Sequence, residues 1–234
     1  MDTGTDLAAQ ATRVGALADP TRRALYEYVV AHRDAVGREA AAAALDLPMH
    51  SVKLHLDRLV AAGLLVAEFR RLGERTGPGA GRTSKLYRRA AEQVAISLPD
   101  RKYDLVGHIL ASGVERAGQG TPLGEAIDAA AAETGRSVGA AAAPGDADAF
   151  TEVLAGQGFE PQVDDGVVLL ANCPFDTLAK THPALVCGLN RAFVQGVADG
   201  LGCDLTARLE PEAGLCCVKV RPAEVSPAEV SPAP

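Results

Sequence analysis

The sequence predicts a mainly helical chain of two domains, the second of which is α+β. Three observations lead to this prediction. The first hundred residues contain helical periodicity followed by a single glycine-rich hairpin. After residue 159 the pattern changes to short segments typical of antiparallel strands. A length of 234 residues is enough for two modest domains, each with its own core.

A short helix is expected between Pro48, which suits a first helical turn, and Gly63, which can take the left-handed conformation that ends a helix. Its apolar residues recur at the spacing of one helix face: Val52, Leu56, Leu59 and Val60. The other face carries small, polar and cationic side chains: His50, Ser51, Lys53 and, nearer the flank, Arg58. Such a face is one that the major groove of DNA can accept.

A basic hairpin follows this helix. Two strands are expected at residues 64–72 and 84–88, joined by the glycine-rich loop 73–83. From residue 66 to residue 89 there are seven Lys and Arg against two Glu, a net charge of +5. The cations expected to contact phosphates or the minor groove are Arg70, Arg71, Arg75, Arg82 and Lys85. Together the helix and hairpin predict a winged helix-turn-helix domain over residues 1–99, with a solvated basic surface on an ordinary helical domain as the alternative.

The whole-chain charge of −7 does not exclude nucleic acid, because the charge is unevenly spread. Residues 1–100 hold 14 Lys and Arg against 12 Asp and Glu, a net charge of +2, and the remainder holds 9 against 18, a net charge of −9. Local charge steers association with DNA more than the overall balance does.

The rest of the chain is divided as follows. Residues 100–122 are expected to be a linker or dimerisation helix, with its helical part at 103–117. Residues 123–221 are expected to form an α+β sensor domain, with a small antiparallel sheet covered by helices. Residues 222–234 repeat Pro-Ala-Glu-Val-Ser and are expected to be a disordered tail.

The five cysteines all lie at or after residue 173: Cys173, Cys187, Cys203, Cys216 and Cys217. Thiolates from a strand end, a helix and a second hairpin can converge on one soft metal centre such as an iron–sulfur cluster. Alternation along the last strand favours Cys216 over Cys217 as the inward ligand. The Cys-x-x-Cys spacing of zinc ribbons is missing from the sequence, which makes structural zinc the weaker alternative. Buried free cysteines that act as small hydrophobes are the other alternative.

Several motifs carry a resemblance to a known family. They are Ala18-Asp19-Pro20-Thr21-Arg22-Arg23, the run Val52–Leu59 followed by Gly63-Leu64-Leu65, the run Gly81–Arg88, and the run Ser97–Tyr103. The first two resemble ArsR-type winged-helix repressors, and the whole set resembles the family of iron–sulfur-assembly (Suf) repressors over about residues 14–221. The resemblance implies a [4Fe–4S] cluster held by Cys173, Cys187 and Cys216, with Cys203, His182 or an exogenous group as fourth ligand.

We therefore expect a homodimeric regulator that binds double-stranded operator DNA and senses iron–sulfur or redox status. A winged-helix regulator that binds a small molecule or zinc is the alternative. A thiol enzyme that uses Cys173 and His182 is disfavoured, because no third residue to orient the histidine is evident in the sequence. We therefore expect that the protein is not an enzyme. A protein-interaction scaffold leaves the basic hairpin unexplained. No leader and no apolar run of about 18 residues is evident, so a cytoplasmic protein without membrane spans is expected.

Overall fold

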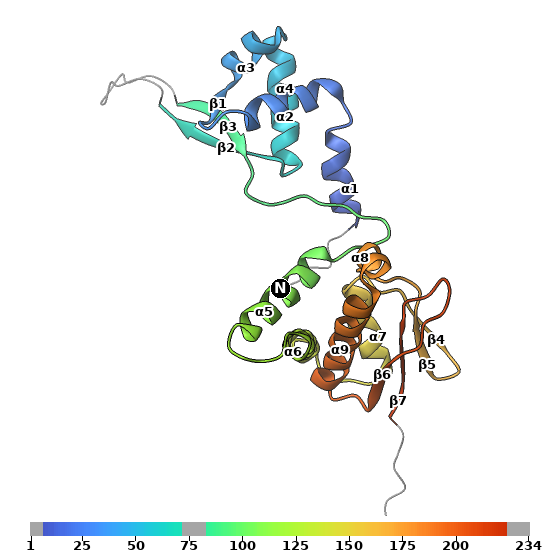
Figure 1. The fold of residues 1–234 in the computed structure, drawn as a ribbon. Coiled ribbons are helices and arrows are strands. Elements are labelled where there is room, and N and C mark those ends of the chain that lie inside the picture. The colour runs from blue at the N-terminus through green and yellow to red at the C-terminus, as the bar shows by residue number, and fades with distance from the viewer. Residues whose placement is uncertain (1–6, 72–82, 224–234) are drawn as a thin grey trace, which may run out of the picture. The chain divides into compact units, whose positions relative to one another are not determined.

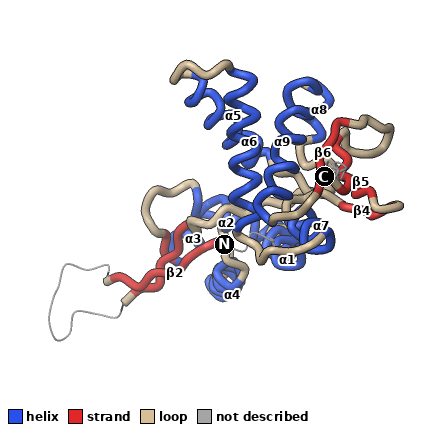
Figure 2. The backbone as a smooth tube through the Cα atoms, turned by 90° about the horizontal axis from the view of Figure 1, so that it is seen from below, coloured by secondary structure: helices blue, strands red, loops and turns tan. Residues whose placement is uncertain are grey.

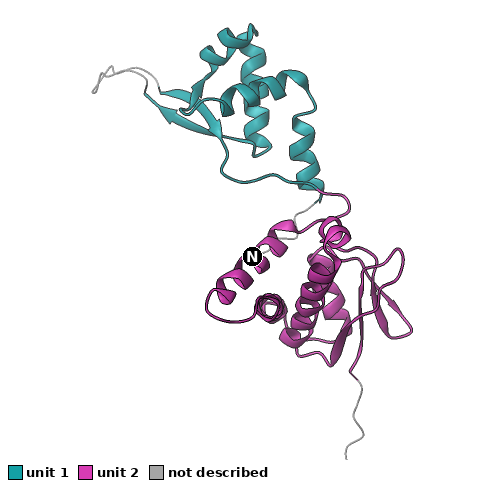
Figure 3. Ribbon diagram, in the orientation of Figure 1, with its two compact units in different colours: residues 1–96 teal, residues 97–234 magenta. Residues whose placement is uncertain are grey.

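The computed structural model describes residues 7–71 and 83–223 of the chain. The chain divides into two compact units, residues 1–96 and 97–234 (Figure 3). The division falls close to the boundary at residue 99 that the sequence indicates. Each unit has its own core of buried aliphatic and aromatic side chains.

The N-terminal unit combines helices with a three-stranded sheet (Figure 1). Its helices are α1 (Leu7–Ala16), α2 (Pro20–Val30), α3 (Arg38–Leu45) and α4 (Met49–Ala61). Its strands are β1 (Val36–Gly37), β2 (Leu65–Arg70) and β3 (Ser84–Arg89), in the order β1-β3-β2 with antiparallel pairing. The β2–β3 hairpin is the expected wing, and its tip lies outside the described residues.

Local sequence signals set the helix ends in this unit. The Asp19 carboxylate accepts a hydrogen bond of 2.9 Å from the Arg22 amide, and Pro20 occupies the first turn, so α2 is capped as its sequence predicts. Asp46 takes a left-handed conformation with φ of 50° in the turn between α3 and α4. Gly63, with φ of 69°, follows α4 and turns the chain into β2.

The C-terminal unit is α+β. Its helices are α5 (Tyr103–Ala117), α6 (Leu123–Ala140), α7 (Ala147–Gly156), α8 (Asp176–Thr181) and α9 (Pro183–Leu201). Its strands are β4 (Pro161–Asp164), β5 (Val167–Leu170), β6 (Leu205–Leu209) and β7 (Val218–Pro222). They form one antiparallel sheet in the order β4-β5-β7-β6. The predicted fold class, an N-terminal winged helix-turn-helix domain followed by an α+β domain with a small antiparallel sheet, is confirmed.

The helices of this unit lie in layers on one face of the sheet. Helix α9 packs directly on the sheet, α6 packs on α9, and α5 packs on α6 (Figures 1 and 2). The core runs through these layers, from Val106 and Ile109 in α5 to Val218 and Val220 in β7.

Glycines let α6 and α9 approach each other closely. A Cβ atom added at Gly135 of α6 would collide with the backbone of Phe193, and one added at Gly196 of α9 would collide with the backbone of Ala132. A Cβ atom added at Gly139 or at Gly200 would likewise collide with the backbone of the opposite helix. These backbones can touch only because neither helix carries a side chain at the contact points.

Some sequence-based boundaries need correction. The expected linker 100–122 lies in the C-terminal unit, where α5 contributes buried side chains to the core. Strand β7 begins at Val218 and continues through Pro222, which pairs with Leu205 although the sequence placed it in the tail. Helix α8 was not predicted, since six residues are too few to display a helical period. The rest of the predicted tail, residues 224–234, lies outside the described part of the chain.

Candidate functional site

Helix α4 turns one face inward and one face outward. Val52, Leu56 and Leu59 are completely buried in the core of the N-terminal unit, as their spacing predicts. His50, Lys53 and Arg58 are exposed, and Ser51 is half-buried. The exposed face also carries Met49 and Leu54, which are 43% and 52% exposed. An apolar side chain on such a face can contact the methyl group of thymine.

The wing carries exposed arginines toward both its tip and its base. Arg70 and Arg71 are exposed at the end of β2, and Arg88 and Arg89 are exposed at the end of β3. The Arg88 guanidinium lies 3.5 Å from the Glu68 carboxylate on the neighbouring strand. Arg75 and Arg82, both expected to contact DNA, lie outside the described residues.

Lys85 makes a contact inside the domain. Its ammonium lies 2.6 Å from the Asp57 carboxylate of α4, and the Tyr87 hydroxyl donates a 3.0 Å hydrogen bond to the same oxygen. Burial raises the pKa of Asp57, but the hydrogen bonds from Lys85 and Tyr87 outweigh this and hold it below its usual value. Burial and the hydrogen bond to Asp57 raise the pKa of Tyr87. This carboxylate therefore ties the base of the wing to α4.

Comparison with known protein families supports this geometry. Residues 17–67, which span α2 to the first half of β2, match a family described as a helix-turn-helix domain. The N-terminal unit is a helix-turn-helix domain. Domains of this kind place their second helix in the major groove of DNA, and α4 is the second helix, after the turn that follows α3. Searches of curated proteins and of solved structures found no match to the chain.

The helix-turn-helix domain is followed by the unit that contains every cysteine. Cys173 lies after β5, and Cys216 and Cys217 lie just before β7. The backbone amide of Cys216 donates to the carbonyl of Leu170 at the end of β5, which brings the two cysteine segments together. The Cys216 thiol lies close enough to the thiols of Cys173 and Cys217 for both to influence its pKa. Cys216 is the buried one, at 3% exposed, and Cys217 is half-buried, as the predicted alternation requires.

Asn190 of α9 reaches into this group of thiols. Its side chain is completely buried, and its Nδ2 donates a 3.2 Å hydrogen bond to the Cys216 sulfur. Its Oδ1 has no hydrogen-bond partner among the described residues. A buried amide with one group unsatisfied costs about 1–3 kcal/mol, which calls for an explanation.

The pKa values of the Cys173 and Cys216 thiols are raised in this arrangement. The contact with Cys216 and burial raise the pKa of Cys173 well above its usual value. The contact with Cys173 lowers the pKa of Cys216, whereas the contact with Cys217 and burial raise it, and the net value is about 11. Thiolates are the metal-binding and nucleophilic forms, so the thiols must lose protons before they can bind a metal.

The structure brings only part of the predicted ligand set together. Cys187 lies one turn before Asn190 on α9, a spacing at which helix side chains are neighbours. Cys203 lies beyond the C-terminal end of α9, where its sulfur donates to the carbonyl of Gly145 at 3.1 Å. It is therefore separated from Cys187 by nearly the whole length of the helix. His182 is exposed at the α8–α9 junction. Among the described residues, no three His, Cys, Asp or Glu side chains already form a metal-binding group.

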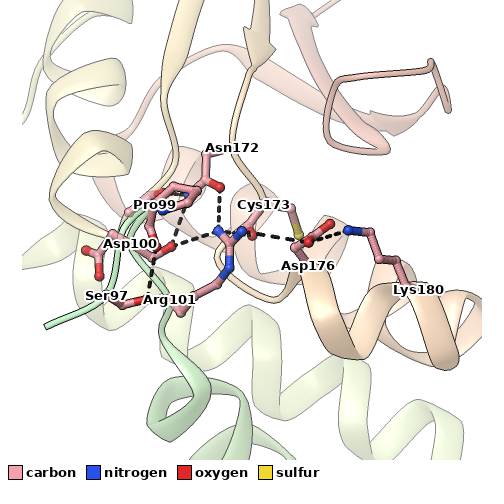
Figure 4. Close-up of polar contacts among 9 residues, drawn as sticks. Ser97, Pro99, Asp100, Arg101, Asn172, Cys173, Asp176 and Lys180 are labelled. Carbon is pink, nitrogen blue, oxygen red and sulfur yellow. Dashed lines mark hydrogen bonds and ion pairs between the residues drawn. The ribbon is translucent and has the colours of Figure 1, made fainter. Parts of the chain in front are cut away.

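A depression of about 440 Å³ opens beside the thiols. Its lining includes Pro99, Arg101, Asn172, Cys173, Asp176 and Cys216. Arg101 lines it, and the Arg101 guanidinium donates to the Asn172 Oδ1 at 2.5 Å (Figure 4). Asn172 is itself 6% exposed. The cysteine site is thus bordered by buried polar side chains rather than by apolar ones alone.

Sequence reasoning missed Leu54 on the exposed face of α4, and Arg101, Asn172 and Asn190 at the cysteine site. Leu54 could have been found, because it lies off the apolar stripe of its own helix. The other three carry no local signal, since each acquires its partner from a distant part of the chain. Within the described residues, no helix is long and apolar enough to cross a membrane.

Proposed function

We propose that this chain is a transcriptional repressor that binds double-stranded operator DNA as a homodimer. The observation that carries the proposal is the outward face of α4, with His50 and Lys53 exposed, inside a segment that matches a helix-turn-helix family. Polar and cationic groups on that face read base edges. Exposed arginines of the wing contact phosphates. A dimer presents two such helices to the two halves of an operator.

The test of DNA binding is a titration of fluorescent operator fragments at several salt concentrations. Phosphate contacts release counterions, so the logarithm of the affinity should fall linearly with the logarithm of the salt concentration. Lys53→Ala should weaken specific binding about tenfold, because one base or phosphate contact contributes on the order of 1–3 kcal/mol. Arg33→Ala, which removes an exposed cation from the loop after α2, is the control and should leave affinity unchanged. Full operator affinity in the Lys53 variant would refute the assignment of α4.

We further propose that the cysteine site holds an iron–sulfur cluster, of the [4Fe–4S] type, and that its presence controls operator affinity. Cys173, Cys187 and Cys216 are the proposed ligands, with Cys217 as the alternative to Cys216. His182 or an exogenous group would complete the set, and Cys203 is disfavoured by its position at the far end of α9. When bound, such a cluster supplies oxygen-sensitive electron chemistry at this site.

Two features of the residues support this proposal. The donors are soft thiols gathered from separate segments, which is the donor type that iron–sulfur clusters take. Asn190 supplies a buried N–H to the Cys216 sulfur, and such a hydrogen bond stabilises a thiolate and tunes the potential of a cluster. The Oδ1 of the same side chain has no partner within the described part of the chain, as expected where a further group is to be accommodated beside it.

The test is the visible spectrum of protein purified without oxygen, combined with operator affinity before and after the colour is bleached in air. A brown protein whose operator affinity changes on bleaching supports both parts of the proposal. A protein that stays colourless after anaerobic reconstitution with iron and sulfide contradicts the cluster. In that case a regulator that binds zinc or a small molecule becomes the better hypothesis, and the DNA-binding proposal is unaffected.

A further inference from the structure

The first six residues of the C-terminal unit, residues 97–102, are bound to the loop that carries Cys173. The N-terminal unit ends at Ile96, and α5 begins at Tyr103. We call residues 97–102 the strap. They contain no helix or strand, so their position depends on side-chain and loop contacts.

Those contacts converge on residues 172–176. The Arg101 guanidinium donates to the Asn172 side chain at 2.5 Å and to the Cys173 carbonyl at 3.3 Å (Figure 4). It also lies 3.7 Å from the Asp176 carboxylate. In return, the Asn172 amide donates to the Asp100 carbonyl at 3.0 Å. The Lys102 amide donates to the Pro174 carbonyl at 3.2 Å.

These contacts are specific and shielded from water. The Arg101 side chain is 18% exposed, and Asn172 also donates to the Gly158 carbonyl at 2.6 Å. The planar guanidinium offers several donors in a fixed arrangement, so one side chain holds the strap and both sides of Cys173 at once. A lysine at this position could supply the positive charge but not several hydrogen-bond donors in a fixed planar arrangement.

We propose that the strap transmits the state of the Cys173 loop to the end of the helix-turn-helix unit at Ile96, and that Arg101 is its positioning residue. The Cys173 side chain belongs to the thiol group, whereas its backbone carbonyl is bound by Arg101. A change at the sulfur that shifts this loop therefore weakens the contacts that order the strap. By thermodynamic linkage, loss of the strap contacts also changes the equilibrium for reversible modification of the sulfur.

This inference rests on the proposed function only for its effect on DNA, because the coupling between loop and strap is a property of the C-terminal unit. It predicts a signal that can be measured without DNA. Amide hydrogen exchange in the strap should respond to modification of Cys173.

The probe is methyl methanethiosulfonate, which transfers a CH₃S group to a thiol and releases methanesulfinic acid. Full modification of Cys173 is verified by mass spectrometry. In the wild-type chain, exchange in peptides covering residues 97–106 should accelerate at least about fivefold after modification, because the amide of Lys102 loses its ordered partner. In Cys173→Ser, the same reagent should leave exchange in these peptides unchanged.

Arg101→Gln should show fast strap exchange before modification and no further response to it. Arg101→Lys should show strap exchange at a rate between those of the wild type and Arg101→Gln. Arg116→Gln is the matched control, because Arg116 pairs with Glu133 between α5 and α6 in the same unit and, among the described residues, makes no hydrogen bond or ion pair with the cysteine loop. It should respond as the wild type does.

Unchanged strap exchange in fully modified wild-type protein overturns the inference, even if the Arg101 variants fail to fold. Operator titrations then separate the two proposals. If affinity responds to the state of the thiols equally in wild type and Arg101→Gln, the strap is not the route, and the proposed function stands. If the strap responds but the protein binds no operator, the coupling stands, and the proposed function fails.

Discussion

Asn190 and Cys216 form a buried amide–sulfur pair, in which the Nδ2 of Asn190 donates to the Cys216 sulfur over 3.2 Å. The two residues come from α9 and from the segment before β7, and both are almost completely removed from water. A donor fixed on a sulfur favours its deprotonated, metal-binding form. The pair therefore joins the packing of the C-terminal unit to the chemistry of its thiols.

Replacing Asn190 should separate these two roles. Asn190→Leu removes the donor and also the unpaired Oδ1, so the metal-free protein should lose little stability. Its affinity for Co²⁺, followed by thiolate-to-cobalt absorption, should fall about 10–100-fold, as is typical when a group supporting a ligand is lost. Gln195→Leu is the control, because this amide on the same helix bonds to Leu205 and Ala207 of β6. It should lower stability and leave Co²⁺ affinity intact; the reverse result would reject the role of Asn190.

The metal-free protein should lose stability in alkali. The folded pKa of Cys216, about 11, lies above its ordinary value of 9.0, so the fold favours the protonated thiol. The protonated Cys216 thiol makes its full contribution to the free energy of unfolding below pH 9. This contribution, on the order of 2 kcal/mol, is lost as the pH rises toward 11. Urea denaturation at several pH values measures this. Cys216→Ala should give a flatter profile over the same range, and identical profiles would contradict the assignment.

Lys85 and Arg70, both expected to contact DNA, should behave differently. Lys85→Ala breaks the pair with Asp57, and because that carboxylate is 39% exposed and screened by solvent, the melting temperature should fall by only about 2–4 °C. Arg70→Ala should leave the melting temperature unchanged and reduce the salt dependence of operator binding by about one ion. Thermal melts and salt titrations of both variants check this. A reduced salt slope in the Lys85 variant at unchanged stability would show that Lys85 contacts phosphate instead.

The contacts of Asp57 with Lys85 and Tyr87 also make the stability of the N-terminal unit depend on pH in the acid range. The pKa of Asp57 is held below its ordinary value of 3.8, so its contribution is present above that pH and is lost as the pH falls through the folded pKa. Asp57→Asn should remove this part of the acid sensitivity, measured by thermal melts between pH 3 and pH 6. An unchanged acid profile in this variant would mean that other carboxylates determine it.

Leu54 should contribute to operator recognition. Leu54→Ala removes a side chain that is 52% exposed, so the stability of the domain should hardly change. Operator affinity should fall if the side chain contacts a thymine methyl, and replacement of that thymine by uracil should reproduce the loss. Wild-type affinity in the Leu54 variant would exclude the contact.

The α6–α9 contact should tolerate no added methyl group. Gly196→Ala places a Cβ against the backbone of Ala132, where nothing can move aside, so overpacking should cost about 1–3 kcal/mol or more. Gly107→Ala is the matched control in α5, because nothing lies within 4 Å of the added atom. It should stabilise the helix by about 0.5–1 kcal/mol. Urea denaturation distinguishes them, and equal stability of the two variants would contradict the close approach of the helices.

Much of the helix-turn-helix domain follows from local pattern. Val52, Leu56 and Leu59 share a face because a helix repeats every 3.6 residues, and that face is the buried one. The alternation that favoured Cys216 over Cys217 also matches the observed burial. In α5, periodicity is less informative. Val114 lies at helical spacing from Val106 and Leu110, yet it is 59% exposed, because the contact surface is set by the approach of α6.

The sequence by itself determined the helix with its exposed polar face, the cationic hairpin beside it, and the concentration of thiols in the second domain. These are properties of neighbouring residues, and short-range periodicity and charge encode them. Only the tertiary structure decided that Lys85 meets Asp57, that Cys203 lies at the far end of α9, and that Arg101 binds the Cys173 loop. Those contacts join residues that are 28, 58 and 72 positions apart, and their partners are selected by the packing of whole elements, which no local pattern records.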